Sequence, residues 1–308
     1  MIKDIIKDMM AWLLSPQKGR EVIFLLLFSV SLFAEQTQPI VGAEQTSAQQ
    51  TELEAVSERN PTARCLLFGI GRTHQLDTYL SPMEYSGIQV SFMVQSERMT
   101  HLANRHISFQ STFFGSFTST DNPAGSADYL GGRLAYDAGW HYHYNVLPCL
   151  DVKGGVLVGT DLGFLYNSRN GNNPAQGRFG VDLSLSAGAD YSFLLPLFRG
   201  RRLPMMLHYQ ADLPMIGLMF CPEFGESYYE IYQHGVGHDI VASHPGNSLC
   251  LRQLLTMDFQ FRRVTMRMGY LCDIRQSTAR NIRYHDVSHS FMLGFVRHFQ
   301  LMRLKVKD

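Results

Sequence analysis

The strongest constraint on the fold is an alternation of apolar and polar side chains that runs through the chain from residue 62 onward. In the stretch 150–166, for example, Val156 falls on one face of an extended chain, and Lys153 and Asp161 fall on the other. No window of 11–18 residues in this region has a sustained helical period of 3.6. A period of two is the pattern of β-strands with one apolar face, so the sequence predicts an all-β fold.

Charge and composition narrow the classes of function. Charged residues make up 18% of the 308 residues, below the roughly 25% of an average protein. The mean hydropathy is nevertheless slightly negative, which excludes a bundle of transmembrane helices. Lys and Arg together number 27, as do Asp and Glu, so no nucleic-acid partner is expected. The five cysteines form no CxxC pair, and no motif in the chain predicts a cofactor.

The N-terminal region has the features of an export signal. Val22–Phe33 is an uncharged apolar run that is preceded by Lys18 and Arg20. As a helix this run would span about 18 Å, less than the ~30 Å hydrocarbon core of a membrane. We therefore expect a signal peptide over 1–34 rather than a membrane anchor. Residues 35–61 are rich in Gln, Thr, Glu and Ser and lack aromatic side chains, which predicts a disordered periplasmic linker.

Two architectures produce the observed alternation, a soluble β-sandwich and a membrane β-barrel. In a barrel the apolar face meets lipid and the polar face lines the lumen. The barrel is favoured because many alternating segments reach 14–19 residues, against about 5–6 for a typical globular strand. Aromatic side chains also crowd the segment ends, as in 140–144 and 164–166, which is typical of membrane interfaces.

We predict an antiparallel transmembrane β-barrel of ten strands over 62–300, followed by a C-terminal tail over 301–308. The predicted strands are 63–72, 84–97, 105–118, 129–144, 149–167, 179–193, 203–213, 248–260, 264–275 and 287–300. The connections alternate between long (73–83, 119–128, 168–178, 214–247, 276–286) and short (98–104, 145–148, 194–202, 261–263). Long extracellular loops and short periplasmic turns are typical of outer-membrane barrels. Twelve strands would follow if the connection 214–247 contained a hairpin.

These patterns predict a location in the cell outer membrane, with outer-membrane lipids and the barrel-insertion machinery as partners. The assignment of faces predicts that Val156→Arg blocks insertion more than Gly155→Arg, because charge facing lipid costs about 2–4 kcal/mol at the midplane. The orientation predicts that an epitope near Gly246 is accessible on intact cells.

Two stretches of the chain resemble recurring sequences of a known family. They are Tyr79–Gly87 (YLSPMEYSG) and Met219–Ile231 (MFCPEFGESYYEI). In this order they resemble an uncharacterised outer-membrane β-barrel family of Bacteroidota-type bacteria, which is known as a domain of unknown function. The resemblance covers residues 62–300. It implies an outer-membrane barrel, but no activity and no catalytic residues.

The longest predicted connection, 214–247, holds the residues expected to bind a surface ligand, whose identity the sequence does not give: Glu223, Glu226, Glu230, His234 and His238. His234 and His238 are four residues apart, so a helix would place both on one face, as metal ligands require. Gly235 and Gly237 lie between them and disfavour that helix, so no metal is predicted. We expect this connection to fold as an extracellular cap with a short helix over 227–233.

Charged side chains on the polar faces predict a network inside the barrel. Its expected members are Arg133, Asp137, His141, His143, Asp151, Lys153, Asp161, Asp182, Asp190, His208, Asp212, Arg252, Asp258, Arg267 and Asp273. A barrel of ten strands has a narrow lumen, so these charges are expected to pair and to plug the interior. Together with the cap, this predicts surface binding or a structural role in the envelope.

The alternative function is a hydrolase that acts on lipid or on a surface polymer. Ser288 and Ser290 are candidate nucleophiles, but the alternation places His289 on the opposite face of the strand. His285 and His208 are further candidates for the base. Catalysis needs a base within about 3 Å of the nucleophile and a third group that orients the base. Because no such set falls on one face, the sequence favours the surface barrel.

Overall fold

The computed structural model describes residues 62–171, 173–196, 202–261 and 264–299, which belong to one compact unit. The predicted signal peptide, the linker and the C-terminal tail lie outside the described residues.

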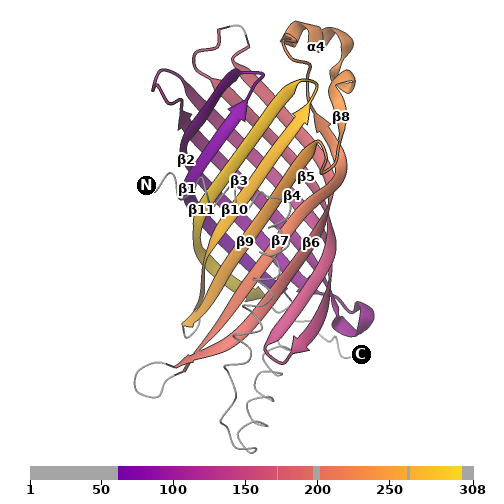
Figure 1. Cartoon of the computed structure of the whole chain (residues 1–308). Helices are drawn as coiled ribbons and strands as arrows, with labels where there is room; N and C mark the ends of the chain where they lie inside the picture. The colour runs from indigo at the N-terminus through magenta and orange to yellow at the C-terminus, as the bar shows by residue number, and fades with distance from the viewer. Residues whose placement is uncertain (1–61, 172, 197–201, 262–263, 300–308) are drawn as a thin grey trace, which may run out of the picture. The chain divides into compact units, whose positions relative to one another are not determined.

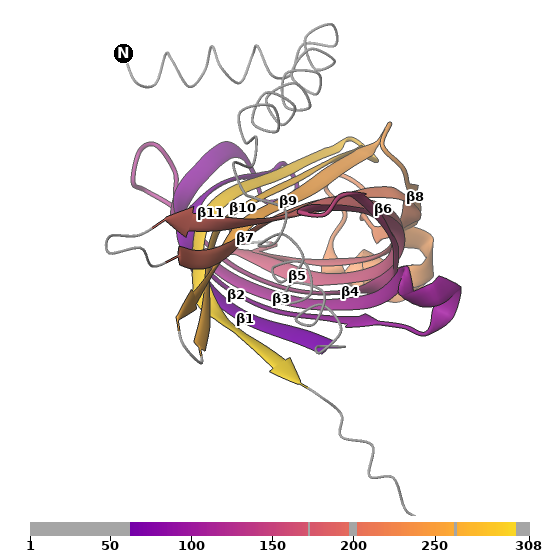
Figure 2. The same ribbon diagram turned by 90° about the horizontal axis from the view of Figure 1, so that it is seen from below.

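Ten long antiparallel strands form a closed barrel (Figure 1), and Figure 2 shows it from below. The wall strands are β1 (Thr62–Asp77), β2 (Ser81–Met99), β3 (Ile107–Asp121), β4 (Asp128–Leu147), β5 (Leu150–Asn167), β6 (Ala175–Pro196), β7 (Arg202–Phe220), β9 (Ser248–Phe261), β10 (Val264–Ala279) and β11 (Ile282–Phe299). Each strand pairs with its neighbours along the chain, β7 pairs with β9, and β11 pairs with β1 to close the wall. Among the described residues, the short strand β8 (Ile240–Ser243) pairs only with β7. The prediction of ten strands is confirmed.

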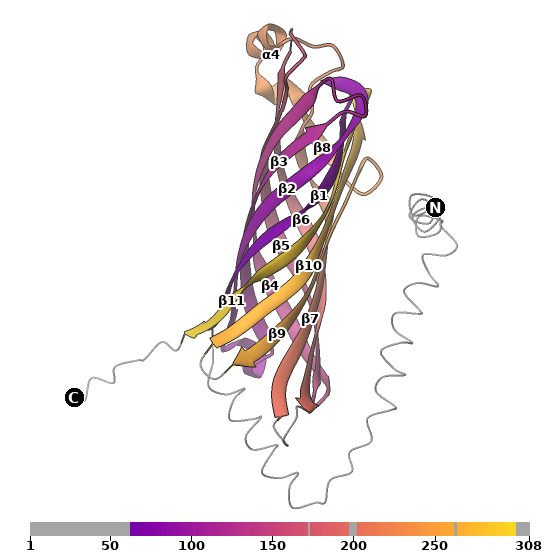
Figure 3. The same cartoon turned by 90° about the vertical axis from the view of Figure 1, so that its left-hand side faces the viewer.

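The two ends of the barrel differ. At one end, which we call the terminal end, β1 begins and β11 ends, and the 3-10 helix η1 (Leu102–Arg105) connects β2 to β3. The opposite end carries residues 221–247, which we call the cap and which contain α4 (Tyr228–His234), η3 (Val236–Asp239) and β8. Between the ends the strands run obliquely to the barrel axis, as Figure 3 shows. Within the described residues, no helix is long and apolar enough to cross a membrane.

The alternation of the sequence places the side chains on the predicted faces. Along β5, the Lys153 side chain is buried inside the barrel, whereas Val156 and Val158 are exposed outside it. Large exposed apolar side chains surround the barrel, among them Phe68, Ile70, Val90, Phe117, Leu134, Leu162, Leu185, Phe291, Leu293 and Phe295. Exposed aromatic rings lie near both ends, with Trp140, Tyr142 and Tyr144 towards the terminal end and Phe164 and Tyr166 towards the cap. An apolar exterior of this extent is stable against lipid rather than water.

The lumen also contains an apolar core that was not predicted. It consists of Cys65, Leu67, Met93, Phe114, Ala135, Leu254, Leu271, Met292 and Val296, all of them buried. On one side, the Phe114 ring lies 5.3 Å from both the Arg133 and Arg252 guanidinium carbons. On the other side, Cys65 and Leu254 line a cavity together with Arg267. The apolar core therefore lies between charged clusters and fills the middle of the lumen.

The strands are longer than predicted at the cap end. The predicted connections 73–83, 119–128 and 276–286 largely continue their hairpins and leave turns at 78–80, 122–127 and 280–281. The connection 214–247 shortens to the cap, because β7 continues to Phe220. Polar side chains suggested loops in these stretches, but the ladder of an antiparallel hairpin uses backbone groups and tolerates polar side chains on both faces. The contrast in connection length is carried mainly by the cap.

The junction between β7 and β9 is incomplete. These strands pair only over Met205–Asp212 and Arg252–Phe259. Towards the cap end, Gly217–Phe220 of β7 pairs with β8 instead. Pro214, which has no amide hydrogen, and a bulge at Met215 lie where the strands part. The result is a fork in the wall directly below the cap.

Candidate functional site

A chain of acidic and basic side chains crosses the lumen near the terminal end. In order of contact, its members are Asp151, His143, Glu97, Lys153, Asp190, His208, Asp258 and Arg267. The Lys153 ammonium lies 2.9 Å from Glu97 and 3.6 Å from Asp190. The Arg267 guanidinium donates two hydrogen bonds to Asp258, at 2.5 and 2.7 Å. Because these residues come from seven strands, their contacts tie most of the wall together.

A second cluster of ion pairs lies nearer the cap end. It consists of Arg133, Asp137, Asp161, Arg252, Asp273 and Arg275. Arg133 bridges Asp161 and Asp273, with contacts of 2.5 Å to each carboxylate. Arg252 reaches across the lumen from β9 to Asp137 of β4, at 2.6 Å. Side chains of opposite charge therefore neutralise one another inside the barrel.

Two members of these clusters were missed by the sequence analysis. Glu97 and Arg275 are the last residues of two predicted strands, so the sequence suggested that they lie at the rim of the barrel rather than in the lumen. The available signal was the alternation itself, since Glu97 is in phase with Gln95 and Arg275 is in phase with Asp273.

Three predicted members of the network lie in the lumen without an ion pair among the described residues: His141, Asp182 and Asp212. The Nε2 atom of His141 lies 2.8 Å from the Ser186 hydroxyl, which donates to Asp212 at 2.6 Å. The Asp182 carboxylate accepts a hydrogen bond from Ser184 at 2.6 Å.

A third polar group lines the lumen at its cap end. Arg178 lies 2.7 Å from Asp77, and its guanidinium stacks 3.2 Å above the Tyr284 ring. The Asp286 carboxylate accepts a hydrogen bond from Thr73 at 2.6 Å. Sequence reasoning missed this group because most of these residues lie in stretches that were assigned to connections.

The candidate catalytic residues are not brought together. Ser288 and Ser290 are buried in the lumen, and neither forms a hydrogen bond with a histidine in the described part of the chain. His289 points outward, where its Nδ1 atom lies 2.6 Å from the Tyr270 hydroxyl. His285 contacts Glu84 at 3.4 Å. The geometry around Ser288 and Ser290 therefore lacks a base.

The contact of His141, Ser186 and Asp212 also differs from a catalytic triad. A triad places the histidine between the nucleophile and the acid. Here Ser186 is in the middle, and the buried Nδ1 atom of His141 has no hydrogen-bond partner among the described residues. His208 lies between Asp190 and Asp258 rather than beside a serine.

The cap is fastened to three neighbouring connections. The Tyr79 hydroxyl, in the β1–β2 turn, donates to the Glu226 carbonyl oxygen at 2.8 Å, and the Asn173 amide donates to the same oxygen at 3.3 Å. At the β10–β11 turn, Arg280 donates to the Asp239 carboxylate at 2.8 Å. Burial and the nearby charges raise the pKa of Tyr79 to about 12, so this donor keeps its proton at neutral pH. The two stretches that carry the family resemblance meet at Tyr79 and Glu226.

The predicted binding residues all lie in the cap but differ in exposure. Glu230 closes a capping box with Ser227 at the start of α4, and these hydrogen bonds lower its pKa. Glu226 contacts the His234 ring, which raises the pKa of that histidine. Glu226 is half-buried, whereas Glu223, Glu230, His234 and His238 are exposed.

Aromatic side chains that were not predicted as site residues dominate the cap surface. Phe224, Tyr229 and Tyr232 are 63%, 67% and 84% exposed. The cap also contains four carboxylates and no Lys or Arg. Phe224, Tyr229 and Tyr232 therefore present apolar surface to solvent on a cap that also carries acidic side chains.

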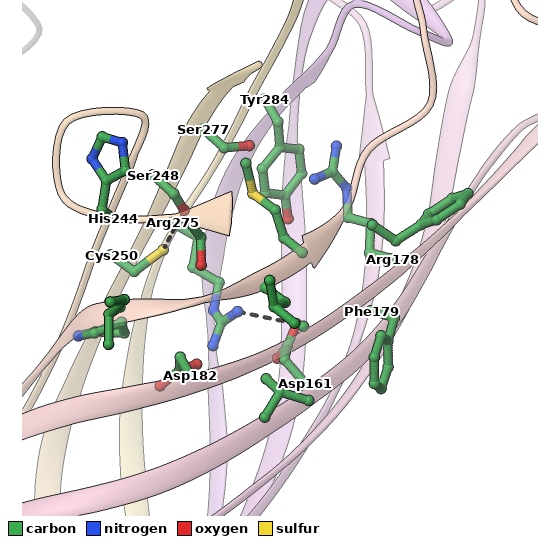
Figure 4. A pocket seen from close by; sticks show the side chains of 18 of the residues that line it. Asp161, Arg178, Phe179, Asp182, His244, Ser248, Cys250, Arg275, Ser277 and Tyr284 are labelled. Atoms are coloured by element: carbon green, nitrogen blue, oxygen red, sulfur yellow. Dashed lines mark hydrogen bonds and ion pairs between the residues drawn. The ribbon is translucent and has the colours of Figure 1, made fainter. Parts of the chain in front are cut away.

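The fork between β7 and β9 contains a pocket, shown in Figure 4, with an empty volume of about 720 Å³ that includes its open mouth. Its lining combines outward apolar side chains, such as Phe179 and Ile216, with lumen side chains, such as Asp182 and Arg275. Arg275 points toward Asp161 at 3.0 Å. The pocket therefore joins the polar lumen to the apolar outer wall.

The closed antiparallel wall, the apolar exterior and the polar, filled lumen define a β-barrel of the outer-membrane type. The chain belongs to the family described as Protein of unknown function (DUF3316), whose model matches residues 22–306. No curated protein matches the chain.

Several solved structures are similar to this chain at low identity. The translocator domain of the autotransporter NalP from Neisseria meningitidis is 12% identical, with a TM-score of 0.35, over 83% of this chain and 97% of that one. The outer membrane protease OmpT from Escherichia coli is 6% identical, with a TM-score of 0.43, over 77% and 96% of the two chains. Ail, the attachment invasion locus protein of Yersinia pestis, is 7% identical, with a TM-score of 0.31, over 76% and 98%.

Proposed function

We propose that this protein resides in the outer membrane of a Bacteroidota-type bacterium as a barrel that does not conduct solutes, and that it binds a partner at the cell surface through its cap. The observation that carries the proposal is the contrast between a filled lumen and an exposed aromatic cap. Leu67, Phe114 and Met292 are completely buried in the middle of the lumen, with ion-paired clusters on both sides.

The filled lumen is tested by conductance measurements on the full barrel in planar lipid bilayers. We expect no stable conductance steps of porin size, because the charges inside the barrel are paired and the apolar core separates them. Steady open channels in the wild-type protein would contradict the closed lumen.

The composition of the cap indicates the chemistry of its partner. Glu223 and Glu230 are exposed on a cap that contains no Lys or Arg, which favours a cationic partner, and exposed tyrosine rings bind cations and apolar groups. A basic segment of a peptide or protein that also carries apolar side chains fits this surface.

A direct test uses a fluorescent peptide of alternating lysine and tryptophan as the probe. We expect the barrel in neutral lipid vesicles to bind this peptide, and Tyr229→Ser combined with Tyr232→Ser to weaken binding at least about tenfold, since exposed aromatic anchors commonly contribute more than 1 kcal/mol each. Tyr144→Ser, at the terminal end, is the matched control. Equal binding by all three proteins would exclude the cap surface.

Surface exposure of the cap is tested separately. An epitope inserted at Gly246, in the turn between β8 and β9, should react with antibody on intact cells. Reaction only after permeabilisation would place the cap in the periplasm.

A second candidate function, the binding of an amphipathic molecule, is favoured by the fork. Asp182 lines its pocket and has no ion-pair partner among the described residues, although most lumen carboxylates do. Gly159 and Gly217 lie opposite Asp182 on the two neighbouring strands, and a Cβ atom at Gly159 would lie 3.0 Å from its carboxylate. An amphiphile with a cationic head could place that head at Asp182 and its tail along Ile216.

This second candidate predicts a preference for the sign of the ligand's charge. The barrel in neutral lipid should bind dodecylamine more tightly than dodecyl sulfate, and Asp182→Asn should remove the preference. Asp128→Asn, an exposed carboxylate at the rim, is the matched control. A preference that survives in Asp182→Asn would exclude this pocket.

A further inference from the structure

The fold of the cap brings together His234 and His238, although Gly235 and Gly237 lie between them in the sequence. Helix α4 ends at His234, and Gly235 follows with a φ of 82°, in the left-handed region that favours glycine. The 3-10 turn η3 then returns the chain toward α4. As a result, the His234 and His238 ring centroids lie 4.6 Å apart without a shared helix. Gly235, which argued against a shared helical face, is the residue that allows this turn.

A buried carboxylate completes the cluster. One ligand atom from each of His234, His238 and Asp239 lies within 4.8 Å of the others. The Asp239 side chain is fully buried, and its Oδ1 atom lies 2.8 Å from the Arg280 guanidinium and 3.4 Å from the Nδ1 atom of His238. Its Oδ2 atom is buried and has no hydrogen-bond partner among the described residues. A buried carboxylate oxygen without a partner is costly, so it retains the capacity to bind a cation.

Glu226 supports the same cluster from the other side. One of its carboxylate oxygens contacts the Nε2 atom of His234, and the other accepts the backbone amide of Glu223 at 2.8 Å. Carboxylates that hold one ring nitrogen commonly orient metal-ligating histidines. Because the side chains of His234 and His238 remain 34% and 54% exposed, an ion can enter from solvent.

We propose that His234, His238 and Asp239 bind a zinc ion, with Glu226 orienting His234. Two imidazoles and a carboxylate are the donor set that zinc prefers over calcium or magnesium, which favour oxygen ligands. The ion would join the end of α4 to η3 and, through Asp239 and Arg280, to the β10–β11 turn. Zinc would thereby hold the cap in place over the barrel. The proposal is independent of the partner that binds the cap.

The test is a titration of the full-length barrel, folded in lipid vesicles and stripped of metal with a chelator, with zinc chloride. We expect saturable binding of one zinc per chain and no comparable binding of magnesium. His234→Ala and His238→Ala should each abolish this binding, and Glu226→Gln should weaken it by roughly 10–100-fold. His244→Ala is the matched control, since His244 lies in the cap outside the cluster.

Limited proteolysis provides a second measurement, which is independent of the zinc titration. Zinc should slow proteolytic cleavage of the cap in the wild type and in His244→Ala, but not in His238→Ala. Both histidine variants are expected to fold, because the two side chains are partly exposed and do not fasten the cap to the barrel. Absence of saturable zinc binding in the wild type, or its retention in the His234→Ala and His238→Ala double variant, would overturn the proposal.

Discussion

The β4–β5 hairpin and the β7–β9 junction represent two ways of building the same wall. β4 and β5 pair from Tyr129–Asn167 to Leu147–Leu150, with one irregularity between Asn145 and Leu147, and are joined by a tight turn. β7 and β9 pair over eight residues each, part at Pro214, and are joined by the entire cap. A tight turn keeps two strands paired to their ends, whereas a long connection allows one strand to leave the sheet.

The difference shows where the barrel can carry function. Backbone groups in a continuous hairpin satisfy one another, so that part of the wall can only face lipid and lumen. At the fork, β7 and β9 no longer pair with each other, and apolar side chains and lumen charges meet beneath the cap. The features that we connect with binding therefore lie at the least complete junction of the wall.

The largest loss of stability is expected when the ion pair between Arg252 and Asp137, beside the fork, is removed. Arg252 lies on β9 where its pairing with β7 ends, and it reaches Asp137 of β4 at 2.6 Å. Arg252→Met leaves that carboxylate without its partner and should lower the free energy of unfolding by about 3–5 kcal/mol. Urea titrations in lipid vesicles measure this loss. Adding Asp137→Asn to Arg252→Met should restore most of the lost free energy of unfolding. If it does not, the ion pair is not the source of the stability.

A smaller effect is expected on the outside of the continuous hairpin. Val156→Arg places charge in lipid and should cost about 2–4 kcal/mol, whereas Val146→Arg, near the end of β4, should cost about 0–1 kcal/mol. The same urea titrations compare the two variants. Gly155 is a poor control, because a Cβ atom there would lie 2.1 Å from the Trp140 carbonyl oxygen. Equal costs at Val156 and Val146 would contradict the placement of the lipid belt.

Hydrogen exchange compares the two regions without mutation. Amides in 213–216 and 248–251 that face the fork, rather than β6 or β10, should exchange faster than those in 154–158, because pairing between β7 and β9 stops at Asp212. Mass spectrometry of the folded barrel measures both sets in one sample. Equal protection would mean that the fork closes in the membrane.

The smallest loss of stability is expected when the hydrogen bond from Tyr79 to the cap is removed. Tyr79→Phe removes the donor to the Glu226 carbonyl oxygen and should cost about 0.5–1.5 kcal/mol. Because the folded pKa of Tyr79 is raised from 10 to about 12, the contribution of its proton is complete below pH 10 and is lost as the pH rises towards 12. Cleavage of the cap by protease should therefore increase over this range in the wild type. In Tyr79→Phe, cleavage of the cap should be faster at neutral pH and should depend less on pH. Identical pH profiles of the two proteins would show that Tyr79 does not cause the pH dependence.

Much of the wall could be predicted because the side-chain period of a strand is a local property. Val156 outside and Lys153 inside follow directly from alternation. The alternation also places Glu97 and Arg275 on the lumen face, but they were not predicted as members of the lumen network because they lie at the ends of predicted strands. The strand ends were predicted too short, because polar side chains do not reveal whether a hairpin continues beyond the apolar belt of the barrel.

The sequence by itself determined the barrel with its ten predicted strands, the face of most side chains and most of the residues that charge the lumen, because each depends on neighbours along the chain. Only the tertiary structure decided which charges pair, such as Arg252 with Asp137 across the lumen, and where the wall forks. It also decided that Gly235 turns His238 back against His234. These contacts join residues from different strands or from both sides of a turn, and their distances depend on barrel closure and backbone angles that no local pattern encodes.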